Sequence, residues 1–360
     1  MSWIGLRDRR DGVFSHVGIG RTQRGPFDLN GIVPQGTMML EFASDPRSGP
    51  QTLLDYGSSH PWAAGLRLTL SETGVLTLRH WQGDQVREFS LPTSLVSIAT
   101  SVTVTYTWDA PMRRGVLALD CAQHGILTFS ELSAPLPLSY RDSMRMMSDA
   151  RHCRVTSNAM FVALADRVMP IGVLPTLSGA TLVQTPTGEQ PVSRLRAGHM
   201  VLTATGDTAQ VRWCGKVTVP ARGRFAPLTM RAPYHGLRHD ITAAHDQQLR
   251  INGPEVEYLF HTERVSLSVG DLRDNLSVRY AARPMTYDYW QVVLDCAEPL
   301  SIAGLAVEGM SIAGLRADPS LKAHSVLANL PAELMPSRAM SPVPHLRAYE
   351  THSLQKLRAA

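Results

Sequence analysis

Two histidines four positions apart, His235 and His239, form a pair that could bind a metal ion. On a helix this spacing places both imidazoles on one face, where they can share the ion. Pro233 and Gly236 oppose a helix here, so we expect a solvated loop without a metal. The cysteines also lack the spacing of a metal site, and we expect buried free thiols, with a Cys121–Cys153 disulfide as the alternative; the four are Cys121, Cys153, Cys214 and Cys296.

Other catalytic patterns are missing from the sequence. There is no Gly-x-Ser-x-Gly nucleophile elbow and no Gly-rich loop that could hold a phosphate. A glycan-acting enzyme would need two carboxylates about 5–10 Å apart on one sheet face, and no Glu-x-Asp-x-Glu-like strand supplies them. The net charge of +4 is spread along the chain, without the Lys/Arg stripe that phosphate backbones select. The sequence therefore predicts no cofactor and no nucleic-acid partner.

The length of 360 residues predicts two domains, because a single core rarely grows so large. The N-terminus lacks the apolar segment of a Sec signal. No run of about 18 apolar residues occurs, so we expect a protein that does not span a membrane. A cytoplasmic location and export by a route without a signal peptide both stay open, and so does the oligomeric state.

Alternating apolar and polar residues before position 170 predict antiparallel strands. Leu66–Leu70 alternates, Ser71–Gly74 turns the chain, and Val75–Arg79 returns. Gly74 can take the positive φ that such a hairpin turn requires. Short strands that recur at this spacing indicate an antiparallel β-sandwich.

A second pair of predicted strands is Val102–Trp108, rich in β-branched and aromatic residues, and Gly115–Asp120, with Asp109–Pro111 breaking the chain between them. The pair resembles a concanavalin A-like (laminin-G-type) jelly roll, in which a V-x-W-D strand precedes a strand ending in Asp-Gly. Cys121 stands here in place of that Gly. The resemblance implies a glycan or protein ligand on one sheet face. For Trp108 we nevertheless expect a core position, and for Asp109 a turn.

The second half of the chain has another regular pattern of strands and turns. Predicted strands lie in Ala180–Thr185, Met200–Ala204 and Gln210–Lys216. In order and spacing they resemble the opening of bacterial Hedgehog/intein (Hint) domains, G-T-x-I-x-T-x-x-G-x-x-P-V-x-x-L-x-x-G-D-x-V-x-T followed by V-R-W-I-G. The agreement continues in later segments, which are Gly253–Phe260, Val292–Asp295 with Glu298, and Leu346–Glu350.

The resemblance implies a curved all-β fold that brings the first residue of the domain close to an internal His. In active members that first residue is Cys or Ser, and its side chain attacks the preceding carbonyl in an acyl shift. The alignment places Thr176 here, after Pro175, and a Thr hydroxyl is a far weaker nucleophile than a thiol near neutral pH. His199 also replaces the Asp of the family's G-D-x-V turn. These departures predict a retained scaffold that has lost its chemistry.

The proton donor of active members is the His of a Thr-x-x-His motif. Thr242 and His245 reproduce this motif, and with Thr176 they are the catalytic residues if autoprocessing is active. A gapless alignment of the following segment instead puts Gln247 in the His position, which would leave no acid. Gln291 stands where the resemblance places a second His.

The expected fold is mainly β. It consists of a concanavalin A-like β-sandwich (jelly roll) over residues 1–170, a Hint-like all-β domain over 171–315, and a C-terminal extension over 316–360 that packs on the Hint-like domain. In the extension we expect a short helix around Ser320–Leu330 and a closing helix over Tyr349–Leu357.

Three functions follow from these observations. The first is a non-catalytic binding or structural protein, in which a lectin-like sandwich with a glycan or protein ligand is carried on a degenerate Hint scaffold. The alternative is an autoprocessing protein that cleaves itself at Pro175-Thr176 by an N-to-O acyl shift. The third is a glycan-acting enzyme. Because the first requires no catalysis and the others do, whether the protein is an enzyme stays open, and the residues that bind a ligand are unknown.

Overall fold

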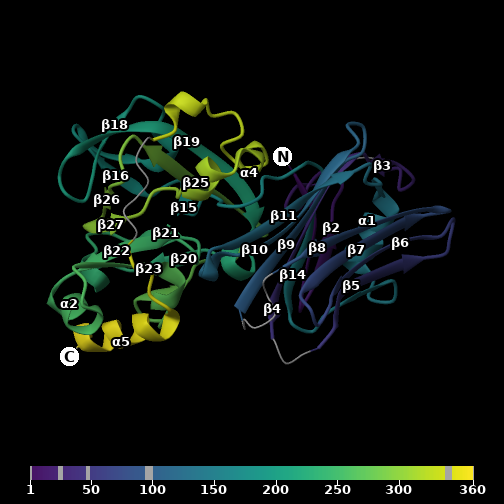
Figure 1. The fold of residues 1–360 in the computed structure, drawn as a ribbon, viewed down its shortest axis with the longest axis horizontal. Coiled ribbons are helices and arrows are strands. Elements are labelled where there is room, and N and C mark those ends of the chain that lie inside the picture. Colours follow the sequence, from purple (N-terminus) through teal and green to yellow (C-terminus); the bar gives the residue numbers. More distant parts are fainter. Residues whose placement is uncertain (1, 23–26, 46–48, 94–99, 337–342, 360) are drawn as a thin grey trace. The chain divides into compact units, whose positions relative to one another are not determined.

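The chain divides into two compact units, Met1–Met169 and Pro170–Ala360, each of which is described by itself (Figure 1). The computed structural model describes residues 2–22, 27–45, 49–93, 100–336 and 343–359. No helix in these ranges is long and apolar enough to cross a membrane.

The N-terminal unit is an antiparallel β-sandwich. Within the described residues its larger sheet has seven strands, in the order β11 (Ile126–Ser133), β10 (Arg114–Cys121), β9 (Thr100–Asp109), β4 (Gln35–Ser44), β14 (Ala159–Ala165), β1 (Trp3–Asp8) and β2 (Gly12–Phe14). The facing sheet has five, in the order β13 (Cys153–Val155), β5 (Gln51–Ser58), β6 (Ala64–Leu70), β7 (Val75–Gln82) and β8 (Gln85–Pro92). Two short strands pair beside them, β3 (Ile32–Val33) and β12 (Leu138–Ser139).

The core of this unit lies between the inner faces of the two sheets. Alternate residues of β6 and β7, among them Leu66, Leu68 and Leu78, are completely buried, as the period of a half-buried strand requires. The predicted hairpin is confirmed: β6 and β7 pair in antiparallel register, and Gly74 in their turn has φ 76°.

The structure confirms the expectations for Trp108 and Asp109. Trp108 is 1% exposed, and its indole N–H donates to the backbone oxygen of Val33 at 2.9 Å. Asp109 accepts a hydrogen bond from the backbone N–H of Met112 in the turn after β9. Because the aromatic ring is buried in the core, Trp108 is not available to a ligand.

The C-terminal unit is also built mainly from antiparallel strands. Its larger sheet, as far as the structure describes it, has the order β18 (Met200–Leu202), β19 (Thr208–Pro220), β25 (Thr286–Leu294), β15 (Leu177–Ser178), β21 (Ile241–Ala243), β20 (Leu228–Met230) and β24 (Val278–Tyr280). A smaller sheet has the order β23 (Arg264–Ser268), β22 (Gln248–Asn252), β27 (Leu305–Val307) and β26 (Leu300–Ile302). A further hairpin joins β16 (Leu182–Thr185) and β17 (Gly188–Pro191).

Helices are short and few in the described residues, which confirms a mainly β fold with a helical tail. They are α1 (Tyr140–Ser148), α2 (Pro254–Phe260), α3 (Ala313–Ala317), α4 (Pro319–Ala323) and α5 (Ala348–Ala359). The expected closing helix is α5, with Leu354 buried but Leu357 40% exposed. The helix expected around Ser320–Leu330 is shorter than predicted: Asp318 caps α4, which ends at Ala323 before a series of turns.

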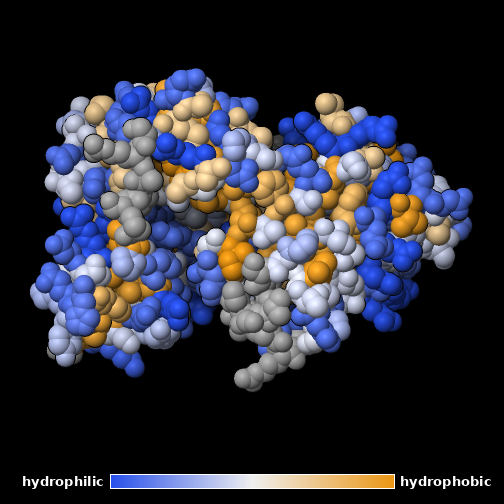
Figure 2. All heavy atoms as spheres, viewed as in Figure 1, coloured by the Kyte–Doolittle hydropathy of each residue, from blue (hydrophilic) through white to orange (hydrophobic). Residues whose placement is uncertain are grey.

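Hydrophilic residues cover most of the visible face of the C-terminal unit, and hydrophobic residues form separate groups on it (Figure 2). The four cysteines are free thiols, as expected from their spacing, but only Cys121 and Cys153 are buried, whereas Cys214 and Cys296 are partly exposed. Burial raises the pKa of Cys153 to about 12 and that of Cys214 to about 11, so neither is a ready thiolate at neutral pH.

Candidate functional site

Thr176 lies one residue before β15, the short strand between β21 and β25. Leu177 pairs with residues of both neighbouring strands, and the backbone N–H of Ala244 donates to the carbonyl oxygen of Thr176 at 2.7 Å. The end of β21 and the middle of β25 are therefore fixed beside Thr176. Gln247 follows β21 and Gln291 lies on β25, and both side chains reach the Thr176 hydroxyl.

The Thr176 hydroxyl is held between two amide side chains. It donates to Oε1 of Gln247 at 2.7 Å and accepts from Nε2 of Gln291 at 3.1 Å. The same Nε2 donates to Oε1 of Gln247 at 3.2 Å, which closes a three-residue ring of hydrogen bonds. Gln247 and Gln291 are 2% and 3% exposed, so water has little access to the ring.

The remaining polar atoms of both amides are also used. Nε2 of Gln247 donates to the backbone oxygens of Gln248 and Glu308, at 2.8 and 2.9 Å. Oε1 of Gln291 accepts from the backbone N–H of Val292 at 3.2 Å. An amide is neither an acid nor a base near neutral pH, so this arrangement can orient the hydroxyl of Thr176 but cannot remove its proton.

Thr242 and His245 have other partners. The Thr242 hydroxyl hydrogen-bonds that of Thr229 at 3.1 Å. Nδ1 of His245 lies 3.2 Å from Asp246, whose other carboxylate oxygen is 3.0 Å from the guanidinium of Arg224. The structure thus brings Thr176 together with the two glutamines, and His245 together with an acidic partner.

Asp246 keeps a negative charge beside the His245 imidazole. Burial raises the pKa of Asp246, but the attraction of Arg224 and the hydrogen bond with His245 outweigh it, so the pKa lies below its usual value. The His245 ring also packs on Gly270, where an added Cβ would lie 1.9 Å from the imidazole. These contacts fix the orientation of the ring.

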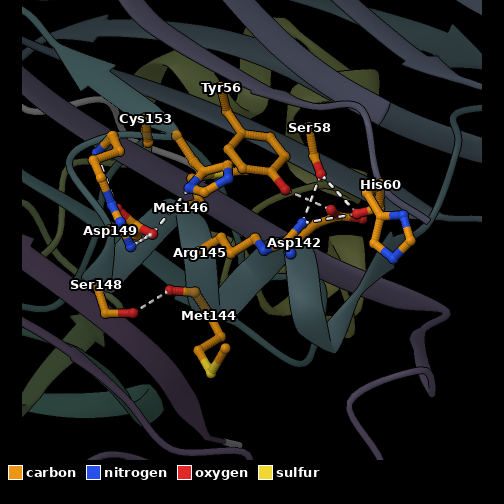
Figure 3. Close-up of polar contacts among 12 residues, drawn as sticks. Tyr56, Ser58, His60, Asp142, Met144, Arg145, Met146, Ser148, Asp149 and Cys153 are labelled. Carbon is orange, nitrogen blue, oxygen red and sulfur yellow. Dashed lines mark hydrogen bonds and ion pairs between the residues drawn. The ribbon is translucent and has the colours of Figure 1, made fainter. Parts of the chain in front are cut away.

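A second cluster of polar side chains lies in the N-terminal unit, where Tyr56 of β5 meets Asp142 of α1 (Figure 3). Asp142, 5% exposed, accepts hydrogen bonds of 2.5 Å from the hydroxyls of Tyr56 and Ser139. Ser139 also caps α1, because its oxygen accepts from the backbone N–H of Asp142 at 3.0 Å. Burial and the bond to Asp142 raise the pKa of Tyr56 far above its usual range, so Tyr56 stays a proton donor.

Arg145 extends this cluster to the loop after β5. Its guanidinium donates to Oγ of Ser58 at 2.6 Å and to the backbone oxygen of His60 at 3.0 Å (Figure 3). The same loop carries Trp62, whose side chain is 51% exposed. Arg145 therefore ties the start of the loop that carries Trp62 to α1.

A small hollow opens between this loop and the start of α1. Asn30, His60, Trp62, Arg141 and Asp142 are among its lining residues, and Arg141 donates to the side-chain oxygen of Asn30 at 2.7 Å. The volume of about 10 Å³ is enough for one water, so a larger ligand would lie across the opening and against Trp62.

Sequence reasoning did not find this second cluster, although a local signal for it exists. Ser139 and Asp142 have the spacing of a helix-capping pair, which marks the start of α1. No sequence signal joins them to Tyr56 and Trp62, which approach through the pairing and loops of the sheets. Nearby, Met146 and Met147 of α1 are buried and fill the core.

The structure describes no group of three or more His, Cys, Asp or Glu side chains arranged to hold a metal ion. His235 lies in a single exposed turn of 3₁₀ helix (Tyr234–Gly236), where a solvated loop was expected. Its Nε2 is 2.9 Å from the Ser277 hydroxyl, whereas His239 lies 3.6 Å from Glu189. The two histidines thus have separate partners.

The family model described as a Hint domain matches residues 175–314. No curated protein sequence matches the chain. Among solved structures, the MchDnaB-1 intein is 18% identical, with 37% of this chain and 98% of that chain covered and a TM-score of 0.25.

Two sialidase structures are also similar to this chain. The CBM40 of the Ruminococcus gnavus IT-sialidase, bound to alpha2,6 sialyllactose, is 15% identical over 39% of this chain and 80% of that chain, with a TM-score of 0.27. The NanB sialidase of Streptococcus pneumoniae is 11% identical over 52% of this chain and 30% of that chain, with a TM-score of 0.29. The match to the family model identifies residues 175–314 as a Hint domain, which this chain carries after an antiparallel β-sandwich.

Proposed function

We propose that this protein is a non-catalytic binding protein, in which the sandwich binds a ligand and the Hint domain keeps its fold without cleaving itself. One observation carries the proposal: the Thr176 hydroxyl is held by the amides of Gln247 and Gln291. Self-cleavage needs a deprotonated nucleophile and an acid for the leaving nitrogen, and an amide supplies neither.

The environment of Thr176 supports this proposal in a second way. A Thr hydroxyl, unlike a Cys thiol, has no appreciable ionised fraction near neutral pH and depends on a base. The hydrogen-bonding atoms of both amides are occupied, so a base or a water would have to displace an existing bond to reach Thr176. The same hydrogen bonds make a stable core for a scaffold.

The first test is the intact mass of the full chain after incubation at pH 7 to 8, with and without hydroxylamine or dithiothreitol. Both reagents intercept an ester at Thr176. We expect a single uncleaved species under every condition, at 39.5 kDa for wild type, and Thr176→Ala should likewise stay uncleaved. Two fragments that meet between Pro175 and Thr176, and that Thr176→Ala abolishes, would establish autoprocessing instead.

A glycan is the ligand that the hollow beside α1 fits best. An exposed indole offers a flat apolar face, and the polar groups of Asn30, Arg141 and His60 surround it. Arg141 bonds a neutral amide and keeps its charge for an acidic sugar. The sialyllactose bound by the Ruminococcus gnavus CBM40 is therefore a suitable probe.

We expect the full chain to bind sialyllactose more tightly than uncharged lactose in titration calorimetry. Trp62→Ala should lower the affinity at least about tenfold, because aromatic anchors dominate binding energies. Met112→Ala is the matched control, since Met112 is 61% exposed but lies in the turn after β9. Equal affinity for both sugars, or unchanged binding by Trp62→Ala, would contradict this placement of the ligand.

A further inference from the structure

A large groove in the C-terminal unit is independent of both the Thr176 site and the hollow. Its volume is about 1150 Å³, above the roughly 300–1,000 Å³ of small-molecule sites. The groove lies beside β22 and is bordered by the α5 residues Leu354, Gln355, Lys356 and Arg358. Its size suits a segment of polypeptide better than a small molecule.

Hydrogen bonds hold the walls of the groove in place. Nε2 of His235 lies 2.9 Å from the Ser277 hydroxyl, which donates to Asp274 at 2.7 Å. The amide of Gln355 in α5 donates to the backbone oxygen of Leu272 at 3.1 Å. A site with fixed walls loses less conformational entropy when it binds a ligand.

Two large apolar side chains lie exposed on the walls. Tyr234 is 39% exposed and Leu276 is 56% exposed, and both line the groove. Ile251 and Leu305, each partly buried, also line the groove and add apolar surface. Exposed apolar residues that line one concave surface are typical of a binding site.

Two of the cations that line the groove lie outside its ion pairs. Arg358 pairs with Glu255 at 3.5 Å, and Arg250 pairs with Glu298 at 3.1 Å. The carboxylate of Asp274 accepts hydrogen bonds from three backbone N–H groups and from the Ser277 hydroxyl. Burial raises the pKa of Asp274, but these hydrogen bonds outweigh it and lower the pKa to about 2.

Arg264 and Lys356 also line the groove and are exposed. Neither forms an ion pair with a carboxylate in the part of the chain that the structure describes. An occupant of the groove would therefore meet two positive charges that are not part of an ion pair, next to apolar surface.

We propose that the groove binds an extended peptide segment that combines apolar side chains with acidic ones. The apolar side chains pack on Tyr234 and Leu276, and the carboxylates pair with Arg264 and Lys356. This binding is separate from a glycan at the sandwich and from any reaction at Thr176, so the result of its test does not depend on either.

The test measures the binding of fluorescent nine-residue peptides to the full chain by fluorescence anisotropy. Leu alternates with Glu in the first peptide, with Lys in the second and with Ser in the third. We expect the Leu/Glu peptide to bind and the other two to bind at least about tenfold more weakly. In the double variant Arg264→Glu with Lys356→Glu, the Leu/Glu peptide should lose at least about tenfold in affinity and the Leu/Lys peptide should gain. Leu276→Ser should weaken binding of the Leu/Glu peptide without strengthening binding of the Leu/Lys peptide.

The matched control is Arg279→Glu with Arg283→Glu, which makes the same charge change on exposed arginines outside the groove. Wild-type affinity in this control would tie the effect to the groove. An equal loss in the control would show general charge attraction and overturn the proposal. So would absence of Leu/Glu binding at about 1 mM peptide, or equal binding of the Leu/Ser peptide.

Discussion

Replacing Thr176 by Cys and Gln247 by His in one chain is expected to produce self-cleavage after Pro175. The Thr176 hydroxyl and the Gln247 side chain are 2.7 Å apart, so a thiol and an imidazole at these positions would form a hydrogen-bonded Cys–His pair. Such a pair activates the sulfur, which attacks the Pro175 carbonyl carbon while the peptide C–N bond breaks and the imidazolium protonates the released nitrogen. Hydroxylamine then takes the acyl group from sulfur and releases residues 1–175.

The measurement is the intact mass over time in hydroxylamine at pH 7 to 8. The double variant should cleave about 10²–10⁴-fold faster than Thr176→Cys alone, which is the usual contribution of a positioned acid–base group. A further change, Gln291→His, tests whether the third member of the ring adds to the rate. If the double variant stays whole, the loss of chemistry lies in the geometry of the backbone at Pro175 rather than in the side chains.

Replacing Arg250 by Met is expected to destabilise the C-terminal unit by about 3–5 kcal/mol at neutral pH. The side chains of Arg250 and Glu308 are 8% and 4% exposed, and they meet at 2.8 Å. Removal of Arg250 would leave the Glu308 carboxylate buried without its partner. Urea unfolding of the full chain, with hydrogen exchange of peptides from the C-terminal unit, would measure the loss.

The cost of this substitution should grow with pH. Burial raises the pKa of Glu308 above its ordinary value of 4.5, and Arg250 opposes this increase. When the pKa of a carboxyl group is higher in the folded state than in the unfolded state, the group stabilises the fold at pH values below the unfolded-state pKa. This stabilisation is lost as the pH rises through the folded-state pKa. Without Arg250 the folded pKa rises further, so the variant should lose more stability than wild type between pH 4.5 and neutrality.

Two controls separate the contribution of the ion pair from that of side-chain packing. The double variant Arg250→Met with Glu308→Leu removes both charges and should regain most of the lost stability. Lys216→Met breaks an exposed pair in the same unit, with side chains 49% and 45% exposed, and should cost about 1 kcal/mol or less. A small effect of Arg250→Met at all pH values would mean that Glu308 finds water or another partner.

Much of the fold followed from the sequence because its signals are local. Alternation in Leu66–Leu70 and Val75–Arg79, with a glycine between them, predicts the β6–β7 hairpin without knowledge of distant residues. The ordered motifs from Ala180 onward predict the Hint domain in the same way. The helix near Ser320 was predicted too long, because its length depends on Asp318 as cap and on the turns that follow, which periodicity does not reveal.

The sequence alone determined that this chain has a β-sandwich and a Hint domain with Thr176 near its start, because strand periodicity, turn residues and motif order are all local. It did not decide between His245 and Gln247 as the neighbour of Thr176. The tertiary structure decided this, because the chain turns at Ala244–Gln247 and directs Gln247 toward β15 while His245 packs on Gly270. The hollow at Trp62 and the Arg250–Glu308 pair also depend on residues far apart in the sequence, which meet only after the sheets have formed.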